Sequence, residues 1–333
     1  MSKRSPVFYP RLSLLILAVA LILPLAIPHP YARHLLVLLA LYVILSDSLN
    51  FVTGFAGQLA LGHAAFPLIG GYVAALLMLM AGWSFWLALL AGAMSAYMAG
   101  LVLGCMAMRL RGDYLGMVTL GFGEIVRLLA LNVEIVGGPM GMPGIPAPRI
   151  GDTVVRGSLS YYYFVLAFAI VTHLSLRRLI FSRFGRACLA IREDEFAAEA
   201  MGINTYRVKV VAWAISSFFG GLTGALYAPW ISLMSPDTFT LVDSVMMCAM
   251  ITLGGIGSLL GPIFGAIIIG ALPEIMRLIV GGGDIASIRM IGVGFFMIVT
   301  LIFAPSGLFG TSMRDPILRL DWLFTRFERR HQA

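Results

Sequence analysis

Long apolar runs alternate with short polar or charged segments along almost the whole chain. A helix needs about 20 residues to cross the hydrocarbon core of a bilayer, and most of these runs approach that length. Read between glycine, proline and charged breakers, the pattern predicts ten membrane-spanning helices. Their predicted ranges are 12–28, 35–53, 62–81, 84–107, 115–132, 161–179, 208–231, 243–256, 260–280 and 287–304. The predicted fold is therefore an all-α polytopic membrane bundle.

Two glycine-rich stretches interrupt this pattern. The eighth run is short and ends in GGIGSLLGP, which favours a broken or re-entrant helix. Non-helical backbone at membrane depth is tolerated only inside protein or beside a water-filled cavity. The other stretch, TGFAGQLALGH, contains Gly54, Gly57 and Gln58. Its glycines allow close helix packing or a broken helix with free backbone groups, so these three residues are candidates for a translocation path.

Composition supports the membrane prediction. Of 333 residues, 60% are hydrophobic and only 12% are charged, whereas soluble domains are about 45–50% apolar and about 25% charged. The three cysteines and five histidines are scattered, so neither a disulfide framework nor a metal centre is predicted. The first apolar run is too long for a cleaved signal peptide, and we interpret it as a retained helix.

The distribution of Lys and Arg predicts the orientation of the bundle, because basic residues are retained on the cytoplasmic side. With the N-terminus inside, the predicted cytoplasmic segments and their flanking helix ends hold seventeen of the 23 basic residues, and the outer segments hold four. We therefore predict a cytoplasmic N-tail (1–11), a membrane domain (12–308) and a basic cytoplasmic C-tail (309–333).

Two pairs of opposite charges lie within predicted spans. Glu124 and Arg127 are three residues apart, as are Glu274 and Arg277, and this spacing places each pair on one helix face. Ionisable groups in a membrane are costly and usually face the bundle interior or a water-filled path. One interpretation is that the pairs line or gate an external vestibule for a zwitterion. The other is that they lock helices together.

One charged segment, residues 185–205, interrupts the apolar pattern on the predicted cytoplasmic side. EDEFAAEAM consists almost wholly of helix-forming residues, and Gly202 is suited to end a helix in the left-handed conformation. The segment therefore predicts a short helix at the membrane surface. It either orients the bundle or docks a partner.

Four stretches together resemble the LivM branch of the branched-chain amino-acid permeases. They are SLNFVTGFAGQLALGHAAFPLIGGYVAALL, LRGDYLGMVTLGFGEIVRLL with the following GGPMGMPGIP, ITLGGIGSLLGPIFGAIIIGAL, and AIREDEFAAEAMGIN. Importer permeases carry a loop written Glu-Ala-Ala, three residues, Gly. Ala197, Ala198 and Gly202 fit this register, with Phe196 in place of the Glu. The resemblance implies that Glu195, Phe196, Ala197, Ala198, Glu199 and Gly202 form a loop that couples to an ATPase.

The resemblance further implies a multi-subunit importer in the bacterial cytoplasmic (inner) membrane. Its other parts would be a homologous LivH-like permease, two cytoplasmic ATPase subunits and a periplasmic binding protein that delivers leucine, isoleucine or valine. The chain has no phosphate-cradling G-x-x-x-x-G-K-[ST] loop, so we expect no enzyme activity and no cofactor of its own, and ATP would bind to the partner subunits.

Three alternatives remain open at this point. Permeases for urea and short-chain amides look similar to this chain. A secondary transporter could use Glu124 and Glu274 as cation sites, although it would not need a docking helix. An intramembrane enzyme is disfavoured because His63 has no Ser or Asp partner in a recognisable arrangement and no H-E-x-x-H metal motif occurs.

Overall fold

The computed structural model describes residues 10–26, 29–107, 110, 112–150, 153–155, 157–280, 294, 298 and 307–309. Helices account for most of this part of the chain. They are α1 (Pro10–Ala26), α2 (Pro30–Asn50), α3 (Ala65–Leu79), α4 (Phe85–Ala107), α5 (Asp113–Asn132), α6 (Ser158–Ile180), α7 (Arg183–Glu193), α8 (Glu195–Ala200), α9 (Thr205–Ile231), α10 (Leu241–Gly254) and α11 (Gly261–Val280).

Short elements complete these helices. A π-helical turn, Phe51–Phe55, continues α2, and two 3-10 turns, Glu134–Val136 and Gly138–Met140, follow α5. Strand β1 (Met142–Pro143) pairs antiparallel with β4 (Leu233–Met234), and β2 (Arg149–Ile150) pairs with β3 (Thr153–Val154). The β1–β4 pair joins the connection after α5 to the connection after α9.

Five of the predicted spans correspond to helices that are long and apolar enough to cross a membrane. They are Pro30–Phe55, Phe85–Ala107, Asp113–Asn132, Ser158–Ile180 and Thr205–Ile231. The first predicted span, 12–28, coincides with the 17-residue α1 as far as Ala26, and the ninth begins with α11. The tenth, 287–304, falls outside the described residues except at positions 294 and 298, and so does almost all of the predicted N-tail and C-tail. The described chain is thus consistent with an all-α polytopic bundle.

Two predicted spans are short helices. The third prediction, 62–81, is too long, because α3 begins at Ala65 and has 15 residues. The preceding stretch is non-helical, and Gly57 has a φ of 68°, which a helix cannot accommodate. The eighth is α10, with 14 residues. Both helices are too short to span alone, so the bundle contains two discontinuous elements.

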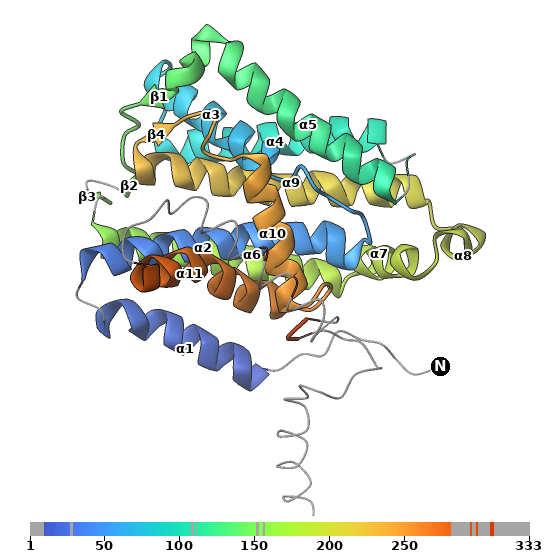
Figure 1. The fold of residues 1–333 in the computed structure, drawn as a ribbon. Helices are drawn as coiled ribbons and strands as arrows, with labels where there is room; N and C mark the ends of the chain where they lie inside the picture. Colours follow the sequence, from blue (N-terminus) through green and yellow to red (C-terminus); the bar gives the residue numbers. More distant parts are fainter. Residues whose placement is uncertain are drawn as a thin grey trace, which may run out of the picture.

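The helices form two layers. Figure 1 shows α3, α4, α5 and α9 on one side and α1, α2, α6 and α11 on the other, with α10 running across between them. Helix α9 packs most extensively on α4 and α3. This close approach requires glycine: a Cβ at Gly224 would overlap the carbonyl oxygen of Pro67, and one at Gly70 would overlap that of Gly221.

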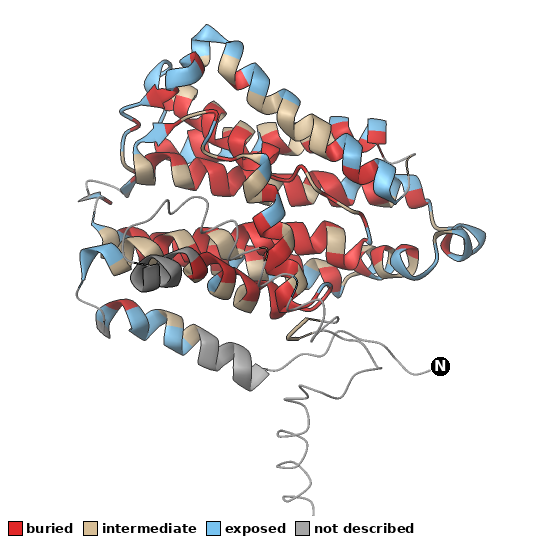
Figure 2. Ribbon diagram, viewed as in Figure 1, coloured by how far each residue is buried: buried red, intermediate tan, exposed pale blue. Residues whose placement is uncertain are grey.

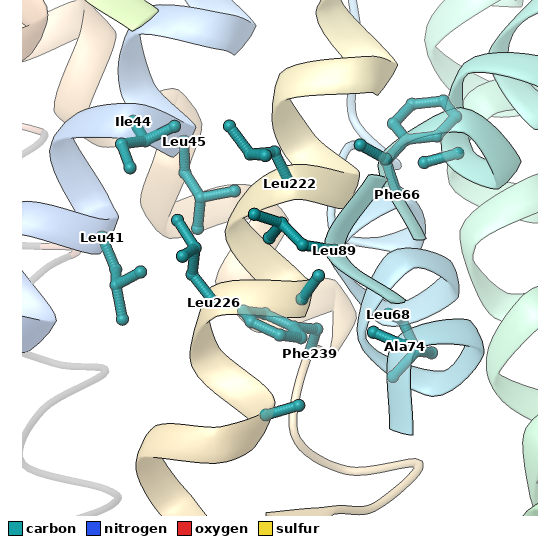
Figure 3. Close-up of a cluster of buried hydrophobic side chains, with 14 of the residues drawn as sticks. Leu41, Ile44, Leu45, Phe66, Leu68, Ala74, Leu89, Leu222, Leu226 and Phe239 are labelled. Atoms are coloured by element: carbon teal, nitrogen blue, oxygen red, sulfur yellow. The ribbon is translucent and has the colours of Figure 1, made fainter. Parts of the chain in front are cut away.

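The core follows α9 through the middle of the molecule. Burial is densest along α9, α3 and α2, whereas α5 and the α8 end are largely exposed (Figure 2). In Figure 3, Leu222 and Leu226 of α9 lie between Leu41 and Leu45 of α2 on one side and Phe66 of α3 on the other. This apolar packing joins the two layers, with α3 inside one layer and α10 between the two.

Candidate functional sites

A small pocket lies where the two discontinuous helices begin. The first residues of α3 and α10 line it together with one face of α5. The lining includes Gly62, Ala64, Leu120, Gly123, Thr240 and Ser244. Helix N-termini carry partial positive charge, so the first residues of α3 and α10 direct two such ends toward this pocket.

Side chains from α5 and α10 fix the stretch before α3. The backbone N–H of Ala64 donates to Ser244 Oγ at 3.0 Å, and that of Leu61 donates to Thr119 Oγ1 at 3.1 Å. Gly62 lies against the Thr119 carbonyl, with no room for a Cβ. Movement of α3 relative to α5 or α10 would therefore break specific hydrogen bonds beside the pocket.

An ion-pair cluster borders the same pocket. Arg127 Nη2 lies 2.8 Å from Glu124 Oε1, and Arg127 Nη1 lies 2.9 Å from Asp237 Oδ1. The predicted pairing of Glu124 with Arg127 is confirmed by this geometry. Asp237 was missed because it is 110 residues from Arg127. Two carboxylates and one guanidinium leave the cluster with one net negative charge.

The second predicted pair is placed only by its backbone. Glu274 and Arg277 belong to α11, but their side chains lie outside the described part of the structure. Their pairing therefore remains a prediction.

Gly54, Gly57 and Gln58 do not lie with the charged cluster. The Gly54 carbonyl accepts a hydrogen bond from Arg192 Nη1 of α7, and Gly57 packs against the same arginine. Gln58 is buried, and its Nε2 donates to the Ala56 carbonyl at 3.1 Å. The two glycines therefore contact α7. They lie at the α2 end of the non-helical stretch that leads to α3, away from the charged cluster.

The charged segment forms two helices rather than one. The backbone is extended at Asp194, whose carboxylate accepts hydrogen bonds from the N–H groups of Phe196 and Ala197 and so begins α8. An Asp at this position caps a new helix, which explains why α7 does not continue. Gly202 has the predicted left-handed φ, 83°. Figure 1 shows α7 and α8 projecting at the right-hand end of the bundle.

Helix α8 is held to α9 while part of its surface stays open. Lys209 Nζ of α9 lies 2.6 Å from Glu195 Oε1, and Thr205 Oγ1 donates to Glu199 Oε1 at 2.6 Å. Ala198 is buried and Ala197 is exposed. Two apolar side chains are also exposed, Phe196 at 68% and Met201 at 83%. A fixed helix that presents large apolar side chains can dock a partner.

Among the described residues, no group of three or more His, Cys, Asp or Glu side chains could hold a metal ion. The candidate sites described here are the pocket and the α7–α8 segment (Arg183–Ala200).

Comparison with known proteins identifies the family. The model of the branched-chain amino acid transport system permease component matches residues 31–304. The chain belongs to this permease family. It is 36% identical to the high-affinity branched-chain amino acid permease protein LivM of Escherichia coli K12, over 92% of this chain and 76% of LivM.

More distant relatives place the permease within a wider group. It is 25% identical to LivH of Salmonella typhimurium, over 81% of this chain and 91% of LivH. It is also 29% identical to the guanosine ABC transporter permease protein NupQ of Bacillus subtilis, over 54% of this chain and 60% of NupQ. The chain is therefore a membrane transport permease, and its relatives have different stated substrates.

Proposed function

We propose that this permease is the membrane subunit of an ATP-driven importer that carries leucine, isoleucine and valine across the bacterial cytoplasmic membrane by alternating access. The similarity to LivM over most of the chain supports this substrate class. The sequence contains no phosphate-binding loop, so separate ATPase subunits would bind ATP and drive transport.

The observation that carries this proposal is the capped α7–α8 segment. It is anchored to α9 through Glu195 and Lys209. Phe196 on the segment and Met201 directly after it are exposed. We propose that Glu195, Phe196, Ala197, Ala198, Glu199 and Gly202 dock into a cytoplasmic ATPase subunit. A second copy of the ATPase would serve a homologous, LivH-like permease.

The pocket between α3, α5 and α10 is the proposed substrate contact on the external side. An amino-acid ammonium group would be attracted to Glu124 and Asp237, and its carboxylate to Arg127 and the two helix N-termini. Glu274 and Arg277 are proposed to line the same path. An ion pair on α5 would be costly in contact with lipid, so the second permease is expected to cover this face. A periplasmic binding protein would deliver the substrate to this pocket.

Copurification and uptake test the docking role. In membranes that contain both permeases and the ATPases, Phe196→Ala combined with Met201→Ala should strongly reduce the ATPase that copurifies. Met140→Ala is the control because Met140, in the connection after α5, is also highly exposed, at 88%. Equal copurification of the ATPase with both variants would contradict docking through α8.

Proteoliposomes separate the remaining alternatives. The importer should accumulate labelled leucine only with the binding protein and internal ATP, whereas an ion-coupled carrier would transport as a single chain in an ion gradient. Competition by isoleucine, valine, urea, acetamide and guanosine identifies the substrate class. Competition by isoleucine and valine alone is expected.

A further inference from the structure

Arg192 of α7 contacts the chain before α3 and the chain after α10, the two short helices of the bundle. It lies in the last turn of α7, where its Nη1 donates to the carbonyl of Gly54 at the end of the α2 π-helical turn. Its stem packs on Gly57, and its guanidinium lies against Gly257, in the turn between α10 and α11. One side chain thus touches two turns that are 200 residues apart in the sequence.

Glycine at each contact leaves room for this side chain. Gly57 and Gly257 have φ values of 68° and 78°, a conformation that favours glycine. A Cβ at Gly57 would lie 3.1 Å from Arg192 Cγ, and one at Gly257 would overlap Nη1. The glycines therefore permit both sharp turns and the close approach of Arg192.

Asn50 joins the two turns directly. Its Oδ1 accepts a hydrogen bond from the N–H of Gly257 at 2.9 Å, and its Nδ2 donates to the carbonyl of Ser258 at 2.9 Å. Asn50 is buried and precedes the π-helical turn. Both turns therefore form one hydrogen-bonded unit beneath Arg192. The positive guanidinium also lies near the C-terminal ends of the α2 and α10 segments, where the helix dipole favours a cation.

The turn at Gly57 and the turn at Gly257 each connect to residues that line the pocket beside the ion-pair cluster. From Gly57 the chain runs through the non-helical stretch to the start of α3, where Gly62 and Ala64 line the pocket. From Gly257 it runs back along α10 to Thr240 and Ser244 on the opposite wall. The hydrogen bond between Ala64 and Ser244 closes this loop of contacts.

We propose that Arg192 is the positioning residue through which displacement of the α7–α8 segment moves α3 and α10 at the pocket. This inference rests on the proposed function, because it assumes that an ATPase moves α7–α8. Coupling between distant sites requires an element with two arrangements that both sites bias. In this proposal, the unit formed by Asn50, Gly54, Gly257 and Arg192 is the element that would take a second arrangement when α7–α8 moves.

The test compares Arg192→Ala with Arg186→Ala in the complete importer. Arg186 is the matched control, since it is on the same helix and donates to the carbonyl of Phe181 five residues earlier. With Arg192→Ala, the ATPase should copurify and hydrolyse ATP as in the unmodified importer, while leucine uptake per ATP hydrolysed falls about tenfold. Arg186→Ala should leave this ratio unchanged, and Arg192→Lys should restore part of it.

The outcomes distinguish this inference from the proposed function. An ATPase that fails to copurify with the unmodified permease would contradict the proposed function itself. Normal uptake per ATP in Arg192→Ala would overturn only the role of Arg192. Failure of both Arg192→Ala and Arg192→Lys to assemble would also overturn it, because Arg192 would then be needed for folding rather than for coupling.

Discussion

Helices α9 and α5 are both long and apolar enough to span a membrane, yet their surroundings differ greatly. In the most apolar stretch of α9, 72% of residues are buried, against 22% in α5. Helix α9 packs glycine to glycine against α3 and α4, whereas Ile125 and Leu129 of α5 are exposed. Hydrophobicity therefore does not distinguish a packed helix from an exposed one, whereas the close glycine contacts of α9 do.

The two helices also use charge differently. The Lys209 side chain of α9 is only 3% exposed beside Glu195, whereas the Arg127 side chain of α5 is 26% exposed beside Glu124. A buried pair depends on both partners for stability, and a partly open pair contributes little to it. The buried charge of α9 is therefore structural, whereas the partly exposed charges of α5 are free to serve the substrate contact that we propose.

The largest expected effect is on α9 packing. Gly224→Ala would place a Cβ against the carbonyl oxygen of Pro67, so the purified permease should lose about 3 kcal/mol of stability. Gly121→Ala on α5 is the matched control, because no atom lies within 4 Å of the added Cβ. Thermal melting in detergent measures both variants. Equal melting temperatures would show that α9 is not the tightly packed helix.

The buried ion pair should give the next largest effect. Glu195→Ala leaves Lys209 buried without this carboxylate, which should cost about 2 kcal/mol, less than for a fully buried pair. Thermal melting should show the loss, and the double variant Glu195→Ala, Lys209→Met should recover most of it. If the double variant melts as low as the single one, the pair does not stabilise the start of α9.

Predictions from local sequence patterns were reliable for features that lie within a single helix. The long apolar runs predicted the five spanning helices, and the three-residue spacing predicted the contact between Glu124 and Arg127. The short eighth run ending in glycines predicted a discontinuity, which α10 confirms.

Features that depend on distant parts of the chain were not predictable in this way. Nothing near Arg127 indicates Asp237. The glycines of TGFAGQLALGH allowed a broken helix before α3, but nothing nearby indicates that Thr119 and Ser244 hold this stretch. The break between α7 and α8 had a local signal, Asp194 before Glu195, but the many helix-forming residues around it favoured one continuous helix.

The exposed ion pair should affect transport more than stability. Glu124→Gln keeps the contact between Arg127 and Asp237, so melting should change by less than about 1 kcal/mol. Leucine uptake by the assembled importer should fall about tenfold, as expected for loss of one charged hydrogen bond. Glu134→Gln is the control, because Glu134 is an exposed acid just beyond α5. Unchanged uptake by Glu124→Gln would contradict a role in transport and would mean that Glu124 and Arg127 form a structural pair.

The smallest effect concerns cysteine reactivity at the end of the bundle where α7 meets α9. Burial raises the pKa of the Cys188 thiol to about 12, and Cys188 packs with Ala212 of α9. Only the thiolate reacts, so at pH 8 almost all of the Cys188 thiol is in the unreactive protonated form. Cys105, at the end of α4, is exposed.

Single-cysteine variants therefore test whether burial beside α9 persists in solution. At pH 8 a maleimide should label Cys105 and leave Cys188 unmodified until a denaturing detergent unfolds the chain. A raised pKa in the folded state means that Cys188 contributes stability below its unfolded pKa near 9 and loses it as the pH rises toward 12. Labelling of Cys188 at the rate of Cys105 would mean that α7 separates readily from α9, and Arg192 could not then transmit movement from α8.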